Sequence, residues 1–158
     1  MLPVLATHDA GNRVRALLVE IDPRLAERAR DAAAELGLSR VEVRTADAGI
    51  TDPYLDFAPA QLVLTCGVFG NITRADVRGT LAALPGLLTP GGVVIWTRGR
   101  PEDAADPSER IRTWFAAEGF TELAFTAAGD ATFRVGMHQL TAQPATAPAP
   151  GSRLFSFV

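Results

Sequence analysis

Residues 15–36, RALLVEIDPRLAERARDAAAEL, contain a short apolar run that leads directly into a helical pattern. The run over residues 15–21 is rich in branched apolar side chains, which is typical of a strand buried on both faces. Asp22 and Pro23 are residue types that favour a helix N-cap and the first helical position, and Gly37 is the type that ends a helix. This stretch therefore predicts a strand, a sharp turn and a helix.

Apolar runs of strand length recur along the rest of the chain. They predict strands at residues 41–44, 61–66, 93–97, 120–126, 133–140 and 153–158. Helical patterns separate several of these runs, and such alternation requires crossover connections between parallel strands. We expect an α/β, Rossmann-like fold in one domain over residues 1–158, with a mainly parallel sheet that has helices on both faces. Residues 142–151, AQPATAPAPG, predict an extended connector before the last strand.

Two further helices have characteristic first turns. Thr73, with Asp76 three residues later, resembles a capping box, and the helix that follows is expected to carry apolar side chains on one face as far as Leu88. Asp106 and Pro107 repeat the pattern of an N-cap and a first helical residue, so residues 108–118 are expected to be helical.

The composition excludes several kinds of chemistry. All 15 basic side chains are arginine, which excludes a Schiff-base lysine and the lysine of a phosphate-binding P-loop. One cysteine and two histidines do not suffice for a tetrahedral zinc site of nitrogen and sulfur ligands or for an intramolecular disulfide. The net charge of -3 gives no reason to expect nucleic acid as a partner. With no export signal in the first residues and no unbroken apolar span, we expect a cytoplasmic protein with no membrane partner.

Candidate ligand-binding residues follow the predicted strands, because ligands of open α/β sheets bind beyond the carboxyl ends of the strands. These positions are residues 20–23, 47–48, 66–71 and 98–100. The carboxylate of Glu20 suits two vicinal ribose hydroxyls, because both of its oxygens accept hydrogen bonds. An acid after a strand is more often a helix cap, which is the role expected for Asp22.

Five segments in this order resemble the class I S-adenosylmethionine-dependent methyltransferases. They are LLVEIDPRLAERAR at residues 17–30, VEVRTADA at 41–48, AQLVLTCGVFGN at 60–71, LLTPGGVVIW at 87–96 and EGFTELAF at 118–125. The proline and two glycines before a hydrophobic strand are common in that family, and the early acid is shared with dinucleotide-binding folds. The resemblance implies S-adenosyl-L-methionine as the cofactor and methyl transfer as the reaction.

The resemblance also implies roles for six residues. Glu20 would bind the ribose hydroxyls of the cofactor, and Ile21 would pack near the adenine. Asp47 would accept a hydrogen bond from the adenine amino group, and the backbone N–H of Ala48 would face a ring nitrogen. The remaining two residues, Cys66 and Gly67, would lie beside the methionine part, where backbone carbonyls would bind its ammonium group.

One feature of the family is missing from this sequence. The glycine-rich loop that follows the family's first strand has no counterpart before Glu20. Residues 2–12 fit either the tail of the helix after such a loop, with Gly11 at its C′ position, or a minimal strand at residues 4–6. We favour the helix tail. The chain is then expected to lack a central strand, to bind S-adenosylmethionine poorly or not at all by itself, and to offer an open sheet edge that another copy could fill.

The methyl acceptor is not defined by any motif, and no catalytic residue is predicted. We expect a small molecule, with Asn71, Arg98, Arg100 and His138 as candidate substrate-binding residues, because arginine pairs with carboxylate or phosphate and histidine titrates near neutrality. The structural role of a buried strand residue is favoured for His138. Two alternatives stay open. One is a non-catalytic remnant or partner subunit, which includes a homodimer through the open edge, and the other is an NAD-binding oxidoreductase domain, in which Glu20 serves the same ribose role.

Overall fold

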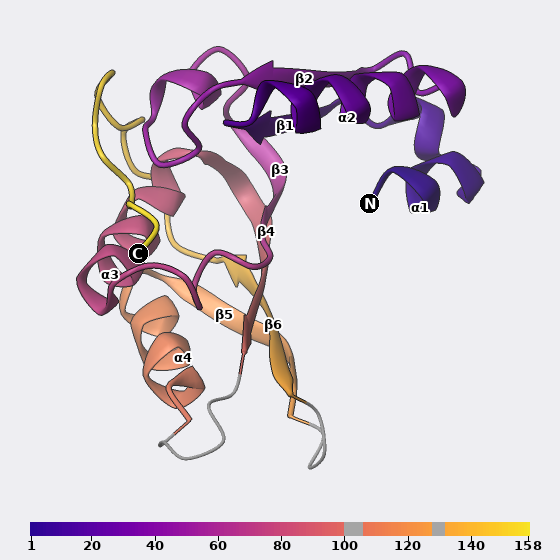
Figure 1. Ribbon diagram of the computed structural model, residues 1–158. Helices are drawn as coiled ribbons and strands as arrows, with labels where there is room; N and C mark the ends of the chain where they lie inside the picture. Colours follow the sequence, from indigo (N-terminus) through magenta and orange to yellow (C-terminus); the bar gives the residue numbers. More distant parts are fainter. Residues whose placement is uncertain (100–105, 128–131) are drawn as a thin grey trace. The chain divides into compact units, whose positions relative to one another are not determined.

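The computed structural model describes residues 1–99, 106–127 and 132–158 (Figure 1). The chain forms two compact units, Met1–Ala48 and Gly49–Val158, and each has its own strands and helices. None of the helices in the described part is long and apolar enough to cross a membrane.

The unit Met1–Ala48 is built on a parallel pair of strands. Its elements are α1 (Leu2–Thr7), a 3-10 turn (Gly11–Arg13), β1 (Ala16–Glu20), α2 (Pro23–Glu35) and β2 (Val41–Thr45). The strands pair from Ala16 with Val41 to Glu20 with Thr45. Arg30 of α2 donates a 2.7 Å hydrogen bond to the hydroxyl of Thr45, which ties the helix to the second strand. The strand, turn and helix predicted from residues 15–36 are thus confirmed.

The ends of α2 are determined by the residues that the sequence indicated. Oδ1 of Asp22 accepts hydrogen bonds from the backbone N–H of Arg24 at 2.8 Å and of Leu25 at 3.4 Å. Gly37 follows the helix with a φ of +68°, a conformation that glycine adopts without steric cost. Asp22 is therefore a helix cap, as expected.

Residues 2–12 are helical at their start rather than extended. The helix α1 covers Leu2–Thr7, and its C-cap is His8. Gly11 is not at the C′ position, so that detail of the prediction is wrong. It opens the 3-10 turn instead, where an added Cβ would lie 1.6 Å from the backbone oxygen of Leu5. Only glycine fits such a close backbone approach.

The described residues of the unit Gly49–Val158 form a four-stranded sheet and two α-helices. Its main elements are β3 (Ala60–Thr65), α3 (Arg74–Ala83), β4 (Leu88–Gly99), α4 (Ser108–Ala117), β5 (Phe120–Thr126) and β6 (Phe133–Leu140), with 3-10 turns at Asp52–Tyr54 and Leu84–Gly86. The strand order is β3-β4-β6-β5. β3, β4 and β5 run in one direction, and β6 runs against them. The α/β class and the mainly parallel sheet are confirmed.

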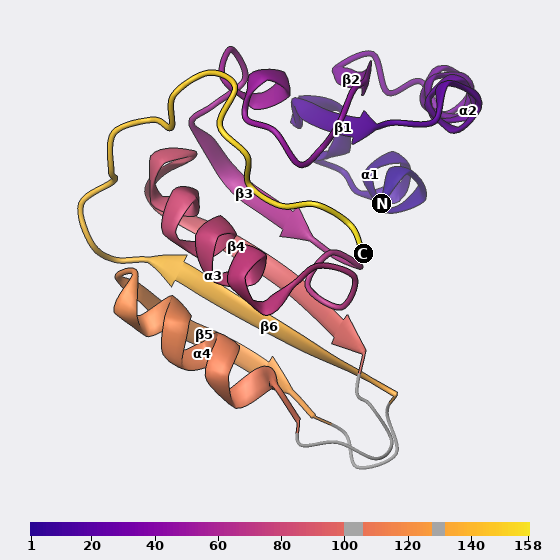
Figure 2. The same ribbon diagram turned by 60° about the vertical axis from the view of Figure 1, so that its left-hand side comes forward.

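The two faces of this sheet differ sharply. α3 and α4 lie on the same face (Figure 2), where Trp96, Phe115 and His138 are almost fully buried. The ring of Phe115 lies 6.3 Å from that of Trp96, and both rings are fully buried. On the other face, strand alternation places apolar side chains that are much more exposed, with Leu62 50% and Leu64 42% exposed.

Two expectations about this unit are wrong. Leu88 does not extend the apolar face of the helix after Thr73 but begins β4, because α3 ends at Ala83 and Pro85 lies in the 3-10 turn that follows. Residues 153–158 do not form a strand. Arg153 bridges Ile50 and Phe157 bridges Ile72, and because these partners belong to different loops no continuous ladder forms.

Candidate functional site

The carboxyl ends of β1 and β2 bring two of the predicted acids to one edge. Glu20 is the last residue of β1 and pairs with Thr45, the last residue of β2. The backbone N–H of Ala46 continues the ladder with a 3.0 Å hydrogen bond to the carbonyl of Glu20. Asp47 follows one residue later. The parallel pairing therefore places Glu20 and Asp47 at the same end of adjacent strands, where ligands of α/β sheets bind.

The turn after β1 orients the carboxylate of Glu20. Its Oε1 accepts a 2.8 Å hydrogen bond from the backbone N–H of Asp22. Since a carboxylate has two oxygens, Oε2 keeps its capacity to accept from a ligand. Ile21 is 68% exposed, whereas Asp47 and Ala48 are half-buried. An exposed isoleucine beside an oriented carboxylate suits contact with an apolar ring.

The loop after β3, residues 66–72, is here called the site loop. Cys66 is exposed, and Gly67 has a φ of +76°. The backbone N–H of Gly67 donates a 2.9 Å hydrogen bond to Oγ1 of Thr97, and its carbonyl accepts a 2.7 Å hydrogen bond from Nδ2 of Asn71. Asn71 is thus joined to Gly67, and its role as a substrate-binding residue stays a prediction. Thr97 was missed from the sequence, although its position at the end of a predicted strand was the available signal.

Arg98 points its guanidinium at the site loop. Its Nη1 donates a hydrogen bond to the carbonyl of Phe69, which is fully buried. Its Nε is buried and has no hydrogen-bond partner among the described residues. Burial lowers the pKa of Arg98 below its ordinary value, and the nearby charge of Asp106 opposes this effect. The other predicted arginine, Arg100, lies outside the described residues.

An ion pair next to Arg98 was also missed from the sequence. Arg134 of β6 lies directly opposite Arg98 of β4, and its Nε donates a 2.7 Å hydrogen bond to Oδ2 of Asp106. Burial alone would raise the pKa of Asp106, but hydrogen bonds from Ser108 and Arg134 outweigh it and lower that pKa. No spacing in the sequence links Arg134 to Asp106, because one lies in β6 and the other just before α4, and only the fold brings them together.

His138 lies in the core of the sheet face covered by the helices. Its side chain is 1% exposed, and its ring stacks on that of Phe115 with the centroids 4.1 Å apart. Nδ1 accepts a 3.2 Å hydrogen bond from Nε1 of Trp96, while Nε2 lies 3.5 Å from Oε2 of Glu122. Burial is the main cause that lowers the pKa of His138 to about 4. This enclosure does not suit the substrate contact suggested from the sequence and agrees with the structural role.

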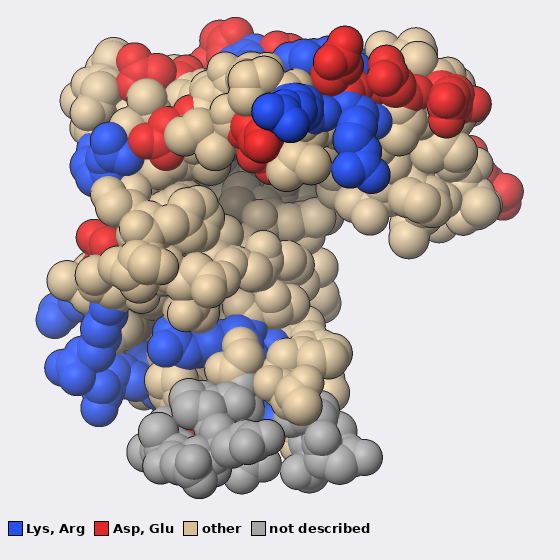
Figure 3. Space-filling view, viewed as in Figure 1, with Lys and Arg blue, Asp and Glu red and all other residues tan. Residues whose placement is uncertain are grey.

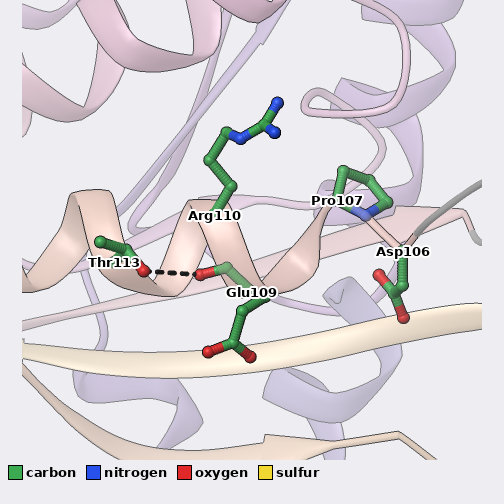
Figure 4. Close-up of a pocket in the computed structure, with 5 residues that line it drawn as sticks. All are labelled: Asp106, Pro107, Glu109, Arg110 and Thr113. Atoms are coloured by element: carbon green, nitrogen blue, oxygen red, sulfur yellow. Dashed lines mark hydrogen bonds between the residues drawn. The ribbon is translucent and has the colours of Figure 1, made fainter.

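A hollow of about 430 Å³ opens at the first turn of α4 (Figure 4). Among the described residues it is lined by Asp106, Pro107, Glu109, Arg110 and Thr113. The hydroxyl of Thr113 is occupied by a 3.0 Å hydrogen bond to the carbonyl of Glu109. None of the predicted site residues that the structure describes lines this hollow, and we do not assign it to cofactor binding.

The predicted residues fall into two groups, one in each unit. Glu20, Ile21, Asp47 and Ala48 belong to Met1–Ala48, and Cys66, Gly67, Asn71 and Arg98 belong to Gly49–Val158. Within the described parts of the chain, no three His, Cys, Asp or Glu side chains gather in a way that would hold a metal ion. The available chemistry is therefore hydrogen bonding from oriented carboxylates, amides and backbone groups.

No protein-family model and no curated protein matches the sequence. Solved structures do match it. The cyclase SpnF has a TM-score of 0.65 at 16% identity, with 90% of this chain and 69% of that chain covered. An O-methyltransferase family protein from Burkholderia thailandensis has a TM-score of 0.64 at 13% identity, with 90% and 55% covered. The fibrillarin pre-rRNA processing protein from Methanococcus jannaschii has a TM-score of 0.62 at 15% identity, with 80% and 56% covered.

The chain has the class I methyltransferase fold. It spans little more than half the length of the Burkholderia and Methanococcus proteins. The presence of a cyclase among the matches is consistent with the general finding that one fold supports different reactions. The comparisons therefore establish the fold of the chain. Its reaction has to be inferred from the chemistry of the site.

Proposed function

We propose that the chain is an S-adenosylmethionine-dependent methyltransferase that acts on a small molecule. The observation that carries this proposal is the parallel pairing of β1 and β2, which sets Glu20 and Asp47 at the same edge. Two acceptors at adjacent strand ends suit a nucleoside, whose ribose hydroxyls and exocyclic amino group are all donors. The methyltransferase fold adds support. The five sequence segments that resemble the family, in the same order, are a second and separate support.

The residues present fit S-adenosyl-L-methionine in the chemistry of their donors and acceptors. Glu20 would accept hydrogen bonds from the ribose, Asp47 from the adenine amino group, and the Ala48 N–H would donate to a ring nitrogen. Gly67 has one carbonyl lone pair that Asn71 leaves unused, and this suits an ammonium group. The cofactor supplies an activated methyl group, so the residues of the chain have to orient the reactants and exclude water.

A small acceptor agrees better with the charge of the chain than a nucleic acid does. The net charge is -3, and acidic and basic side chains are interspersed over the unit Met1–Ala48 (Figure 3). Nucleic-acid binding requires a basic surface that neutralises phosphates. Asn71, Arg98 and Arg100 remain the candidate groups for an acceptor that carries a carboxylate or phosphate.

The test is an NMR titration of the full chain with S-adenosylhomocysteine, which detects dissociation constants into the millimolar range. We expect weak binding, with the largest amide shifts at Glu20, Ile21, Asp47 and Gly67, and smaller or no shifts with NAD. Shifts with NAD alone would favour the oxidoreductase alternative. An absence of shifts with both ligands would reject the proposed function.

A partner subunit is the second candidate function, and a specific observation favours it. β1 is an edge strand of the β1-β2 pair, and β3 is an edge strand of the four-stranded sheet. One side of each strand therefore has no strand partner in the described parts of the chain. Leu62 and Leu64 of β3 are also about half exposed. Open edges of this kind pair readily with another chain. We propose a homodimer as the form this takes.

A further inference from the structure

The site loop is fastened from one side by the end of β4. Thr97 and Arg98 are neighbours on that strand, and they hold two different backbone groups of the loop. The hydroxyl of Thr97 accepts from the N–H of Gly67 at 2.9 Å, and Arg98 donates to the carbonyl of Phe69. Phe69 is fully buried and lies 6.1 Å from the ring of Trp96, measured between centroids. The first half of the loop is therefore tied to the strand and anchored in the core.

The far end of the loop is fastened by residues much later in the chain. The backbone N–H of Val158 donates a 3.0 Å hydrogen bond to the carbonyl of Asn71, and Phe157 bridges Ile72. Phe157 is 59% and Val158 is 85% exposed, and the ring of Phe157 packs edge-on against that of Phe155 with the centroids 5.3 Å apart. The contact with the site loop is made by backbone groups.

The segment that ends in Val158 is itself anchored to the core. The hydroxyl of Thr80 in α3 donates a buried 3.0 Å hydrogen bond to the carbonyl of Leu154, and the N–H of Leu154 donates to Gly49 at 2.7 Å. Leu154 is 8% and Phe155 is 5% exposed. Two buried side chains and a buried hydrogen bond precede the exposed contact with the loop. Because Leu154 and Phe155 are anchored, they fix the position of Phe157 and Val158, which follow closely in the chain.

We propose that Thr97 and the backbone of Phe157 and Val158 are positioning residues, which hold the site loop from two sides in the conformation that binds the ligand. The inference rests on the proposed function, because the ligand is the methionine part of the cofactor. Gly67 is the residue most affected. With its N–H bound to Thr97 and its carbonyl bound by Asn71, the peptide groups on both sides of Gly67 are oriented. Pre-organised backbone groups bind more tightly, because less conformational entropy is lost on binding.

Two matched pairs of variants test this proposal. Thr97→Val removes the hydroxyl that accepts from Gly67, and Thr97→Ser keeps it. Val158→Pro removes the N–H that donates to Asn71, and Val158→Ala keeps it while it shortens an exposed side chain. Arg98 is left unchanged, because it is a candidate substrate-binding residue.

NMR titration with S-adenosylhomocysteine gives the first readout. We expect Thr97→Val and Val158→Pro to raise the dissociation constant roughly five- to tenfold, which corresponds to the loss of one hydrogen bond. Thr97→Ser and Val158→Ala are expected to bind like the unaltered chain. The midpoint of urea unfolding is expected to fall slightly in Thr97→Val and Val158→Pro, because each loses one hydrogen bond of the folded chain, and to stay the same in the two controls. Unaltered affinity in Thr97→Val and Val158→Pro would overturn the proposal.

Amide hydrogen exchange gives a second readout that needs no ligand. We expect the Gly67 amide to exchange faster in Thr97→Val and the Asn71 amide to exchange faster in Val158→Pro, with no change in the two controls. If the unaltered chain binds no S-adenosylhomocysteine, the proposed function fails, and the exchange rates alone decide whether the loop is held. Equal exchange in all variants would overturn the positioning role whether or not the ligand binds.

Discussion

At the scale of single residues, His138 shows how burial decides between the two roles that the sequence left open, of which the structural one was favoured. In the sequence it is a group that titrates near neutrality, which suits a substrate contact. In the structure it accepts a hydrogen bond from Trp96, so its proton must be on Nε2, and its ring is enclosed. The sequence contains its strand but not the ring of Phe115 stacked on it, because that contact depends on how α4 packs on the sheet.

The buried neutral ring predicts a loss of stability in acid. The pKa of His138 is about 4 in the folded chain and about 6.5 when unfolded, so between these values only the unfolded chain binds the proton. The stabilisation is therefore complete above pH 6.5 and decreases as the pH falls towards 4. We expect this group to account for about 3 kcal/mol of the loss in unfolding free energy between pH 7 and pH 4.

Urea unfolding of the unaltered chain and of His138→Gln at both pH values measures this contribution. Asp106 and Glu122 also have lowered pKa values, and their contribution is likewise lost in acid. Because the variant retains these carboxyl groups, the difference between the two chains reports the histidine together with its interaction with Glu122. An equal loss of stability in both chains would show that His138 is already charged in the folded protein.

At the scale of elements, local chemistry predicted the N-caps of α2 and α3, whereas the N-cap of α4 is Pro107, one residue later than the sequence indicated. The N-cap of α2 at Asp22 and that of α3 at Thr73 follow from side chains that bond to the next turn, and such contacts span only two or three residues. The end of α3 was misplaced because Leu88 fits a helical period equally well as a strand. The predicted strand at residues 153–158 is wrong for a related reason. Its residues are apolar enough for a strand, but they pair with two separate loops, which the local sequence does not indicate.

The same substitution, glycine to alanine, is expected to change the unfolding free energy in opposite directions at Gly136 in β6 and at Gly79 in α3. A Cβ on Gly136 would lie 2.3 Å from the ring of Trp96, whereas nothing lies within 4 Å of a Cβ on Gly79. We expect Gly136→Ala to lower the unfolding free energy by about 1–3 kcal/mol through overpacking. Gly79→Ala is expected to raise it by about 0.5–1 kcal/mol, because alanine has the higher helix propensity. Urea unfolding measures both, and a neutral Gly136→Ala would contradict the close packing of Trp96.

At the scale of the whole molecule, the α/β class and the order of elements could be predicted, because apolar runs of strand length alternate with helical patterns along the sequence. The sheet order β3-β4-β6-β5 and the division into two units could not. The same limit applies to the site. Glu20 and Asp47 were predicted because they stand at or just after the ends of two strands, whereas the contacts of Thr97 and of the backbone of Val158 join distant segments of the chain.

The open strand edges and the exposed apolar face predict that the chain associates with itself. Analytical ultracentrifugation over a wide range of concentration is expected to give a mass that rises from 16.7 kDa towards twice that value. Leu62 and Leu64 lie on the half-exposed face of β3, next to its unpaired edge. Replacing both with lysine adds charge that opposes strand addition, so this variant is expected to remain at the lower mass.

Leu123→Lys is the control, because Leu123 is 45% exposed but lies in β5 at the opposite edge of the sheet. Since all three leucines are well exposed, the substitutions are expected to change the unfolding free energy by less than about 0.5 kcal/mol each. Association that persists in the double variant but is lost in Leu123→Lys would move the interface to β5. A mass of 16.7 kDa at every concentration of the unaltered chain would remove the homodimer and leave a different chain as the partner of the open edge.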